Sequence, residues 1–548
     1  MAETLLSPGV LTRENDQSQI TQGPITAGAA IVGPTVKGPV RIPTLVTSYS
    51  DYLNKFGGSF ISGGSSFEYL TSISTYNYFQ QGGTTLLVNR AVSGTFSAAS
   101  SSNIVNANTS SSFALETLSQ GVVNNSTSSE VSGSLPSGSS DNVRFEILNT
   151  NTGSGTFDLL IRRGNDNSNS KVILEQWVGL SLDPNQSNYL EAVIGNQSTT
   201  TDNGYVQTTG DYTNKSRYVR VKSVTSTTPN YFDNNGNPVT SYTTLLPIAQ
   251  SGSFGGAVGT NCGVYGLANG DYTSSISLLN NQDEFKFNII TTPGITATTG
   301  NAVITSLTNL ASNRGDCIAI VDMSKLGDNV ATVISNATSV DSSYAAAYYP
   351  WVQVSAPNTG KLTWVPPSTI IPSVFAYNDR ISAPWFAPAG FTRGSLSVIQ
   401  AERKLAPTDR DTLYAGKINS IATFPGQGVV AYGQKTLQKK ASALDRINVR
   451  RLLIELKSYI GQVANNLVFE QNTIATRNRF LRQVNPYLES IQQRQGLYAY
   501  KVVMDESNNT ADVIDRNQLL GQIFIQPTRT AEFVILDFNV TPTGATFE

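Results

Sequence analysis

A buried-strand pattern on both sides of a long polar stretch limits the fold more than any other feature of this 548-residue chain. Before the polar stretch, Gly28–Val40 predicts a buried strand and a Gly/Pro turn, Leu45–Gly58 a strand and a helix, Ser65–Gln81 a helix, and Leu86–Val92 a strand. After it, Asp316–Asp322 is a continuous apolar strand of the kind that parallel sheets bury on both faces. Strands alternating with helices predict an α/β fold, interrupted by a section of another kind.

The interrupting section is predicted to be mainly β. It opens with Ser93–Ser140, which is rich in Ser, Thr, Asn and Gly and is therefore typical of exposed turns or of disorder. Within the rest of the section, Asp183-Pro184 predicts the start of a helix, since proline suits the first helical turn. The strand candidates that alternate with turn clusters are Val143–Leu148, Phe157–Arg163, Lys171–Trp177 and Ser216–Val221.

The composition excludes several kinds of chemistry. The chain has no histidine, so Ser-His-Asp, Cys-His and His-ligated metal sites are absent. Its two cysteines, Cys262 and Cys317, exclude a disulfide framework and favour a reducing compartment. A net charge of −2 encodes no general attraction to nucleic acid. We therefore expect no catalytic residues, no metal site, no cofactor, no direct nucleic-acid binding and no enzyme activity.

Two patterns that superficially suggest ligand sites have simpler explanations. Gly33–Gly38 contains glycines and a lysine but lacks the spacing and the following Ser or Thr of a phosphate loop, so it predicts a turn. Trp351, Trp364 and Trp385 are compatible with a stacking site, although large aromatic side chains in α/β proteins are more often packed in a core or interface. We expect packing.

Membrane insertion is also not expected. The first ten residues lack a basic region followed by an apolar core, and no 18-residue apolar run occurs in the chain. The sequence predicts a protein that is soluble where it is made.

The last third carries the clearest helical periodicity. Leu453, Leu456, Ile460, Val463 and Leu467 repeat at spacings of three and four residues, which predicts a long amphipathic helix. Ser442 and Asp445 form a variant capping box before this helix. A second helix is expected from about Asn472 to near Gly496, broken or kinked at Pro486.

One flank of this helical pair is basic. Arg446, Arg450 and Lys457 fall within a narrow arc of the first helix. Residues 446–494 hold eight Lys and Arg against three Glu, an excess that contrasts with the slightly acidic chain. Two interpretations remain: a solvated helical face, or a docking face for an acidic protein partner.

The chain ends in an apolar strand pattern without an obvious partner. In Ala531–Val540, alternate residues from Val534 are apolar, as in a strand with one buried face. An unpaired apolar strand requires a neighbour, either in the same molecule or in another. Near the other end, Ser7–Glu14 is a short extended candidate that is either disordered or a second tethered strand.

These segments resemble the tail sheath proteins of contractile-tailed bacteriophages, in particular those of T4-like phages. The resemblance extends from Ser7–Glu14 to the chain end and is strongest after Asp379. It is carried mainly by APWFAPAGFTRG (Ala383–Gly394), TFPGQGVVAYGQKT (Thr423–Thr436), DRINVRR (Asp445–Arg451), DESNNTADVIDRN (Asp505–Asn517) and TAEFVILDF (Thr530–Phe538).

The resemblance implies an α/β plus β fold: a discontinuous, subtilisin-like α/β core domain with an inserted β-rich outer domain and extended terminal strand arms. The likeness to subtilisin would concern fold only, since the chain has no histidine. The implied division is an N-terminal arm (residues 1–25), α/β domain (26–92 and 281–440), outer domain (93–280), a C-terminal helix and sheet domain facing the tube (441–530), and a C-terminal arm (531–548).

The resemblance also implies the partners and the site residues. Subunits would stack as hexameric rings in a helical sheath around a tail tube, contact baseplate and tail terminator proteins, and contract to drive the tube through the host envelope. Assembly would occur in the bacterial host cytoplasm and the product would be part of the virion. Tyr498–Asp505 and Gly521–Pro527 would form the sheet that receives the arms of neighbouring subunits. The arm residues would be Val10, Thr12, Phe533, Val534, Ile535, Leu536 and Phe538, and the tube-facing residues Arg446, Arg450 and Lys457.

Two other classes of function remain open on the sequence alone. A β-rich surface adhesin would explain the Ser/Thr/Asn/Gly section but not the α/β periodicity or the C-terminal helix. A subtilisin-like hydrolase would explain the α/β part but lacks the histidine base.

Overall fold

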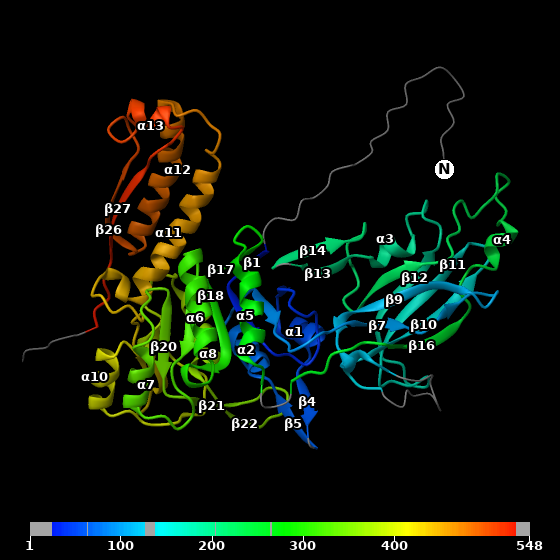
Figure 1. The fold of residues 1–548 in the computed structure, drawn as a ribbon, viewed down its shortest axis with the longest axis horizontal. Helices are drawn as coiled ribbons and strands as arrows, with labels where there is room; N and C mark the ends of the chain where they lie inside the picture. Colours follow the sequence, from blue (N-terminus) through cyan, green and yellow to red (C-terminus); the bar gives the residue numbers. More distant parts are fainter. Residues whose placement is uncertain (1–24, 63, 127–137, 203, 263–265, 533–548) are drawn as a thin grey trace, which may run out of the picture.

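The computed structural model describes residues 25–62, 64–126, 138–202, 204–262 and 266–532. The molecule is elongated, with a helical C-terminal part at one end, an α/β body in the middle and a β-rich part at the other end (Figure 1). It is a mixed α/β protein with several sheets.

The central body is built on an eight-stranded sheet in the order β25-β24-β20-β19-β18-β2-β6-β3. The six inner strands run parallel, and β25 and β3 pair antiparallel at the two edges. In chain order the strands are β2 (Ala29–Gly33), β3 (Thr44–Val46), β6 (Leu86–Arg90), β18 (Ile289–Thr296), β19 (Ile318–Asp322), β20 (Ala345–Tyr349), β24 (Asn419–Phe424) and β25 (Gly428–Tyr432).

Helices bury both faces of this sheet, which explains its nearly uninterrupted apolar strands. Alternate residues such as Ala30 and Val321 face one core and Ile31 and Ile320 face the other. The first core includes residues of α5 (Asn269–Ser277), α6 (Ala297–Arg314), α7 (Val330–Ala337) and α10 (Pro407–Ala415). The second includes residues of α1 (Tyr49–Phe56), α2 (Leu70–Gln80), α8 (Pro367–Ile381) and the first half of α11 (Ile447–Asn465).

The helix predicted over Ser65–Gln81 begins later than expected. Ser65–Glu68 is strand β5, which pairs with β4 (Ser59–Ser62), and the helix α2 starts at Leu70. The rings of Phe60 and Phe67 lie opposite each other across this pair, with centroids 6.0 Å apart. A helical pattern in the sequence does not show that two side chains will pack across a strand pair, so the sequence predicts a helix over residues that form strand β5.

Small elements complete the body. β1 (Ile25–Ala27) pairs with β17 (Phe285–Phe287). The apolar segment Tyr348–Val354 contributes to two strands. β20 ends at Tyr349 and β21 starts at Val352, on either side of Pro350, which has no amide for a ladder. The remaining elements are β21 (Val352–Ser355), β22 (Leu362–Val365), β23 (Gln400–Ala401), α9 (Gly390–Arg393), and the 3₁₀ turns η2 (Leu278–Asn280) and η3 (Ala443–Asp445).

The interrupting section forms a second, antiparallel sheet in the order β12-β11-β10-β16-β7-β9-β15. Its core is a separate cluster of side chains that includes Phe113, Phe145, Phe157 and Val221. The strands are β7 (Ala98–Ser101), β9 (Ser111–Gln120), β10 (Val143–Asn151), β11 (Thr156–Arg163), β12 (Ile173–Ser181), β15 (Val219–Val224) and β16 (Gln250–Gly255), with β8 (Ile104–Val105) paired to β9. The pair β13 (Ser198–Asp202) and β14 (Tyr205–Thr209), α3 (Leu190–Ile194), α4 (Thr240–Thr243) and η1 (Val122–Asn124) lie outside this sheet.

The prediction that Asp183-Pro184 opens a helix is wrong. The helix α3 starts at Leu190, while the Asp183 carboxylate accepts the amides of Asn185 at 3.0 Å and Tyr231 at 3.1 Å. Asp183 therefore stabilises its own turn and holds the loop at Tyr231, which is distant in sequence, so a local sequence pattern does not reveal this role.

The C-terminal part is a helical hairpin covered by a two-stranded sheet. α11 packs against α12 (Ile474–Gln493), and both pack against β26 (Leu497–Val503) and β27 (Gln522–Pro527), with α13 (Ala511–Asp515) between the strands in sequence. Leu456, Val463 and Leu467 are buried in this core, as the periodicity predicts. α12 continues through Pro486, and Ser442 caps the short η3 turn rather than the long helix.

Trp351, Trp364 and Trp385 form no ring contacts with one another among the described residues. Trp351 donates its indole N–H to the Ser324 carbonyl at 2.9 Å, and Trp385 donates to the Arg494 carbonyl at 3.1 Å. Trp364 pairs with Gln353 across β21 and β22. Packing therefore accounts for Trp351 and Trp385.

Candidate subunit-interaction site

The predicted receiving sheet exists as the pair β26–β27. The two strands are antiparallel, with Tyr500 opposite Ile525 and Val502 opposite Ile523. Within the described residues, each of these strands pairs only with the other, so each leaves one edge of backbone groups without a strand partner. Such an edge is a template for a further strand.

The two faces of this sheet differ. Tyr500, Val502, Ile523 and Ile525 pack toward the helical hairpin. On the other face Phe524 is 56% exposed, and Tyr498, at the register irregularity of β26, is 62% exposed. An open edge combined with exposed aromatic side chains is characteristic of a surface that binds another protein segment.

A polar cluster, which we call the C-terminal anchor, holds the chain after β27 against the α/β body. It consists of Tyr414, Gln434, Arg446, Thr530 and Glu532. The Glu532 carboxylate accepts hydrogen bonds from Arg446 Nε at 2.7 Å, from the Tyr414 hydroxyl at 2.7 Å and from Gln434 Nε2 at 3.1 Å. Gln434 Nε2 also donates to the Thr530 hydroxyl. The anchor fixes where the C-terminal segment leaves the described body.

The anchor is partly buried, and this perturbs its titrating groups. Burial opposes ionisation of Glu532, but the hydrogen bonds from Tyr414, Arg446 and Gln434 outweigh it and lower the pKa of this carboxyl. Burial and the Glu532 carboxylate raise the pKa of Tyr414 to about 12. Burial and the neighbouring cations Lys417 and Arg446 lower the pKa of Lys435 to about 8. Near neutral pH, Glu532 therefore carries a full charge opposite Arg446.

The three predicted tube-facing residues lie in different environments. Arg446 belongs to the C-terminal anchor, with its side chain 25% exposed. Arg450 is only 4% exposed, because its guanidinium stacks on the Tyr344 ring at 4.0 Å and donates to the Ser343 hydroxyl. Lys457 is exposed, and its Nζ donates to the Tyr344 hydroxyl at 3.3 Å. The basic arc thus lies against the α/β body at Tyr344, and Arg450 is covered in the single subunit.

The predicted arm residues Val10, Thr12, Phe533, Val534, Ile535, Leu536 and Phe538 lie outside the described residues. Sequence reasoning missed the anchor itself. Tyr414 and Gln434 are 118 and 98 positions from Glu532, so no local pattern connects them.

Among the described residues, one buried carboxyl and hydroxyl pair resembles a catalytic arrangement. The Ser368 hydroxyl donates to Asp322 at 2.5 Å and the Ser368 amide donates at 3.0 Å. Burial raises the pKa of Asp322 to about 7, despite these hydrogen bonds. Both residues are 1% exposed. The pair joins the end of β19 to the start of α8 and does not reach solvent, so its geometry is structural.

The described part of the chain holds neither a metal-binding cluster nor a membrane-spanning helix. It contains no group of three or more acidic or cysteine side chains placed to hold a metal ion. None of its helices has the length and apolar character needed to cross a membrane.

Comparison with known proteins identifies the class. Residues 266–437 match the phage tail sheath protein central domain, and residues 439–541 match the phage tail sheath C-terminal domain. Together these ranges cover half of the chain, and the chain belongs to the phage tail sheath family.

Curated relatives refine this assignment toward T4-like phages. The chain is 43% identical over 185 residues to the tail sheath protein of Vibrio phage KVP40, covering 34% of this chain and 28% of that protein. It is 36% identical over 222 residues to the tail sheath protein of Enterobacteria phage T4, covering 40% of this chain and 33% of that protein. The chain thus spans about a third of the length of the curated relatives it matches.

Solved structures share the fold over nearly the whole chain. The helical sheath of the anti-feeding prophage in its contracted state matches with a TM-score of 0.52 at 17% identity, covering 97% of this chain and 98% of that one. A sheath tail protein from Listeria innocua matches with a TM-score of 0.53 at 12% identity, covering 92% and 96%. At these identities the matches show the fold alone.

Proposed function

We propose that this chain is the structural subunit of a contractile phage tail sheath. Copies would polymerise as stacked hexameric rings around a tail tube and contract to drive that tube through the host envelope. The observation that carries the proposal is the C-terminal anchor beside the open-edged β26–β27 sheet, in a chain of the tail sheath family. The adhesin and hydrolase alternatives are not favoured by the family assignment.

The connections between copies would be made by added strands. The segment beyond Glu532 would pair with the free edge of β26 or β27 in a neighbouring subunit, together with the N-terminal arm at Val10 and Thr12. Each main-chain hydrogen bond contributes about 1 kcal/mol net. Several bonds per arm, with Phe533, Ile535 and Phe538 buried, would keep subunits joined while their bodies reorient.

The organisation into domains supports this arrangement. The α/β body, with parallel strands covered by helices on both faces, would be the subtilisin-like domain, and the antiparallel sheet with its own core would be the outer domain. We place the end of the outer domain before α5, because Tyr272 and Ile276 of that helix pack in the α/β core.

Contact with the tube is proposed for the C-terminal helical part. Of the three predicted residues, Lys457 is the accessible cation, whereas Arg446 and Arg450 support the subunit's own structure. Exposed ion pairs contribute about 0–1 kcal/mol each, which suits a contact that must be released on contraction. Baseplate and tail terminator proteins would bind the ends of the sheath.

The role would be mechanical rather than enzymatic. The energy for contraction would be stored at assembly as a difference between two packings of the same subunits, so no cofactor is required. The assembled protein would be a virion component, built in the bacterial host cytoplasm.

A pair of truncations tests the arm. Removal of Ala531–Glu548 is expected to leave a folded subunit that forms no tubes or stacked rings in negative-stain electron microscopy. The matched control removes only Thr541–Glu548 and keeps the apolar segment Phe533–Val540, and it should polymerise as the full chain does. Normal tubes from the longer truncation would refute strand exchange through this segment.

A further inference from the structure

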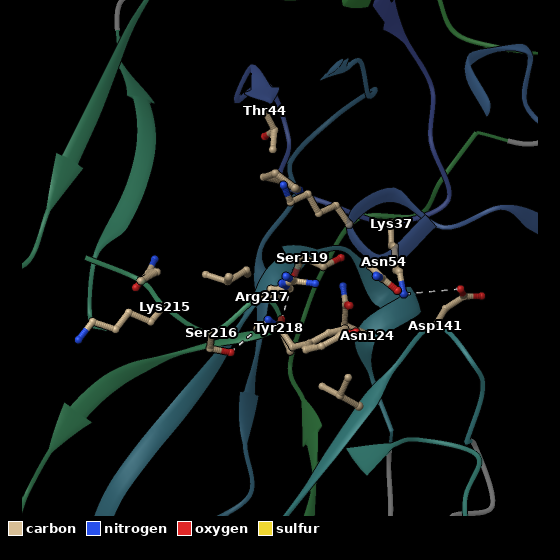
Figure 2. Close-up of a pocket in the computed structure, with 16 residues that line it drawn as sticks. Lys37, Thr44, Asn54, Ser119, Asn124, Asp141, Lys215, Ser216, Arg217 and Tyr218 are labelled. Carbon is tan, nitrogen blue, oxygen red and sulfur yellow. Dashed lines mark hydrogen bonds and ion pairs between the residues drawn. The ribbon is translucent and has the colours of Figure 1, made fainter. Parts of the chain in front are cut away.

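A cavity of about 290 Å³ lies where the α/β body meets the inserted β section. Its body side is formed by residues 37–39 and by Thr44, Asn54 and Lys55. Its other side is formed by the end of β9 and by residues 214–218 before β15 (Figure 2). Asp141, just before β10, completes the wall beside Lys37.

More cationic than acidic side chains line the cavity. Lys37, Lys55, Lys215 and Arg217 all line the cavity, whereas Asp141 is the single acidic residue among the lining residues. Lys55 is paired with a carboxylate, because its Nζ lies 3.0 Å from Asp51 Oδ2 as well as 2.9 Å from Leu45 O. The Nζ of Lys215 donates to Ala192 O at 2.9 Å. Among the described residues, the cationic groups of Lys215 and Arg217 form no ion pair, so the cavity keeps an excess of positive charge that favours anions.

Lys37 is the most buried of these cations. Its side chain is 10% exposed and its Nζ lies 3.9 Å from Asp141 Oδ1, too far for a hydrogen bond. No described residue accepts a hydrogen bond from this ammonium, which has three donors. Burial lowers the pKa of Lys37 against the attraction of Asp141. A buried ammonium in this state requires additional acceptor atoms.

We propose that this cavity binds a small oxyanion of the phosphate type, with Lys37 as its buried contact and Arg217 as its contact from the opposite side. An oxyanion supplies several acceptor oxygens, and it forms short charge-assisted hydrogen bonds with ammonium and guanidinium groups. Asp141 faces Lys37 and Asp51 is paired with Lys55, and the positive charges of Lys215 and Arg217 remain for the anion.

The position gives such an anion a mechanical consequence. A hydrogen bond already joins the α/β body to the inserted sheet beside the cavity: the Gly38 amide donates to the Ser119 hydroxyl at 2.8 Å. The body and the sheet are also joined by Arg90, fully buried, which donates to the carbonyls of Gly38 at 2.5 Å and Gln120 at 2.9 Å. An anion held between Lys37 and Arg217 would add a third connection between the body and the inserted sheet. Bound anion would therefore restrict their relative motion.

Isothermal titration calorimetry of the full chain with inorganic phosphate, at ionic strength held constant with sodium chloride, tests the proposal. We expect one site per chain, with affinity reduced about tenfold or more in Lys37→Met and in Arg217→Ala, as expected for loss of a charge-assisted contact. The matched control is Lys325→Met, which removes an exposed lysine of the body that does not line the cavity.

Thermal unfolding gives a second readout. Phosphate should raise the melting temperature of the wild type and of Lys325→Met more than sodium chloride does at equal ionic strength, and this difference should disappear in Arg217→Ala. Arg217 is exposed, so its variant tests the site even if Lys37→Met fails to fold. Absence of binding, or equal binding by all variants, would overturn the proposal and would indicate that Lys37 is satisfied by water alone. Both readouts use the unassembled subunit, so they are independent of the proposed sheath function.

Discussion

The C-terminal anchor predicts a defined effect of the substitution Glu532→Gln. Glutamine keeps the size of the side chain and one acceptor oxygen but loses the charge that faces Arg446 at 2.7 Å. A hydrogen bond to a charged group contributes about 1.5–3 kcal/mol and a neutral one about 0.5–1.5 kcal/mol. The two side chains are only 20% and 25% exposed, so screening by solvent is modest. The loss should be about 1–1.4 kcal/mol, which is an increase of about 5- to 10-fold in the opened population.

Trypsin provides a direct assay, because Arg529 lies immediately before the anchored residue Thr530. When opening is fast relative to cleavage, the cleavage rate follows the population of the opened segment. Cleavage after Arg529, measured by mass spectrometry of the intact chain, should therefore be about 5- to 10-fold faster in Glu532→Gln than in the wild type. Arg446→Gln should act similarly, and the double variant should add little to either single change.

The matched control is Glu506→Gln, which changes an exposed glutamate outside the anchor and should leave cleavage after Arg529 unchanged. Wild-type cleavage rates in Glu532→Gln, or fully additive effects of the Glu532 and Arg446 changes, would show that the ion pair does not hold this segment.

Three further predictions concern buried groups. Because the pKa of Asp322 is raised to about 7, the unfolded chain loses the proton of this carboxyl before the folded chain does as pH rises from about 4. The free energy of unfolding of the wild type should therefore fall by up to about 1.4 kcal/mol per pH unit up to about pH 7. Asp322→Asn should remove this pH dependence, which urea titrations at pH 5 and pH 7 would measure. Arg450→Glu should lower the free energy of unfolding by about 2 kcal/mol or more, since it buries a carboxylate against Tyr344. Lys457→Glu should change it by less than about 0.5 kcal/mol, and thermal unfolding measures both effects. Leu488→Ala, at a fully buried site of the helical hairpin, should cost about 2–5 kcal/mol by the same measurement, and a much smaller loss would refute its placement in that core.

Helical periodicity places the residues of the basic arc on one side of α11, but it does not show what that side contacts. Arg450 and Lys457 share one side of α11, and both reach Tyr344. Whether that side faces solvent or the α/β body depends on Tyr344, which is more than a hundred positions away in sequence. Tube contact remains a prediction, and it rests mainly on Lys457.

The sequence by itself determined the elements whose signal is local. Buried strands such as β2 and β19 follow from continuous apolar runs, and α11 follows from leucines repeated at helical spacing, because each pattern reflects the geometry of a single element. The tertiary structure alone decided what distant residues form together: the anchor of Glu532 on Tyr414 and Gln434, the burial of Arg450, and the cationic cavity between Lys37 and Arg217. These sites depend on side chains brought together across long stretches of chain, and the energies that hold them arise only after the sheets and helices have packed.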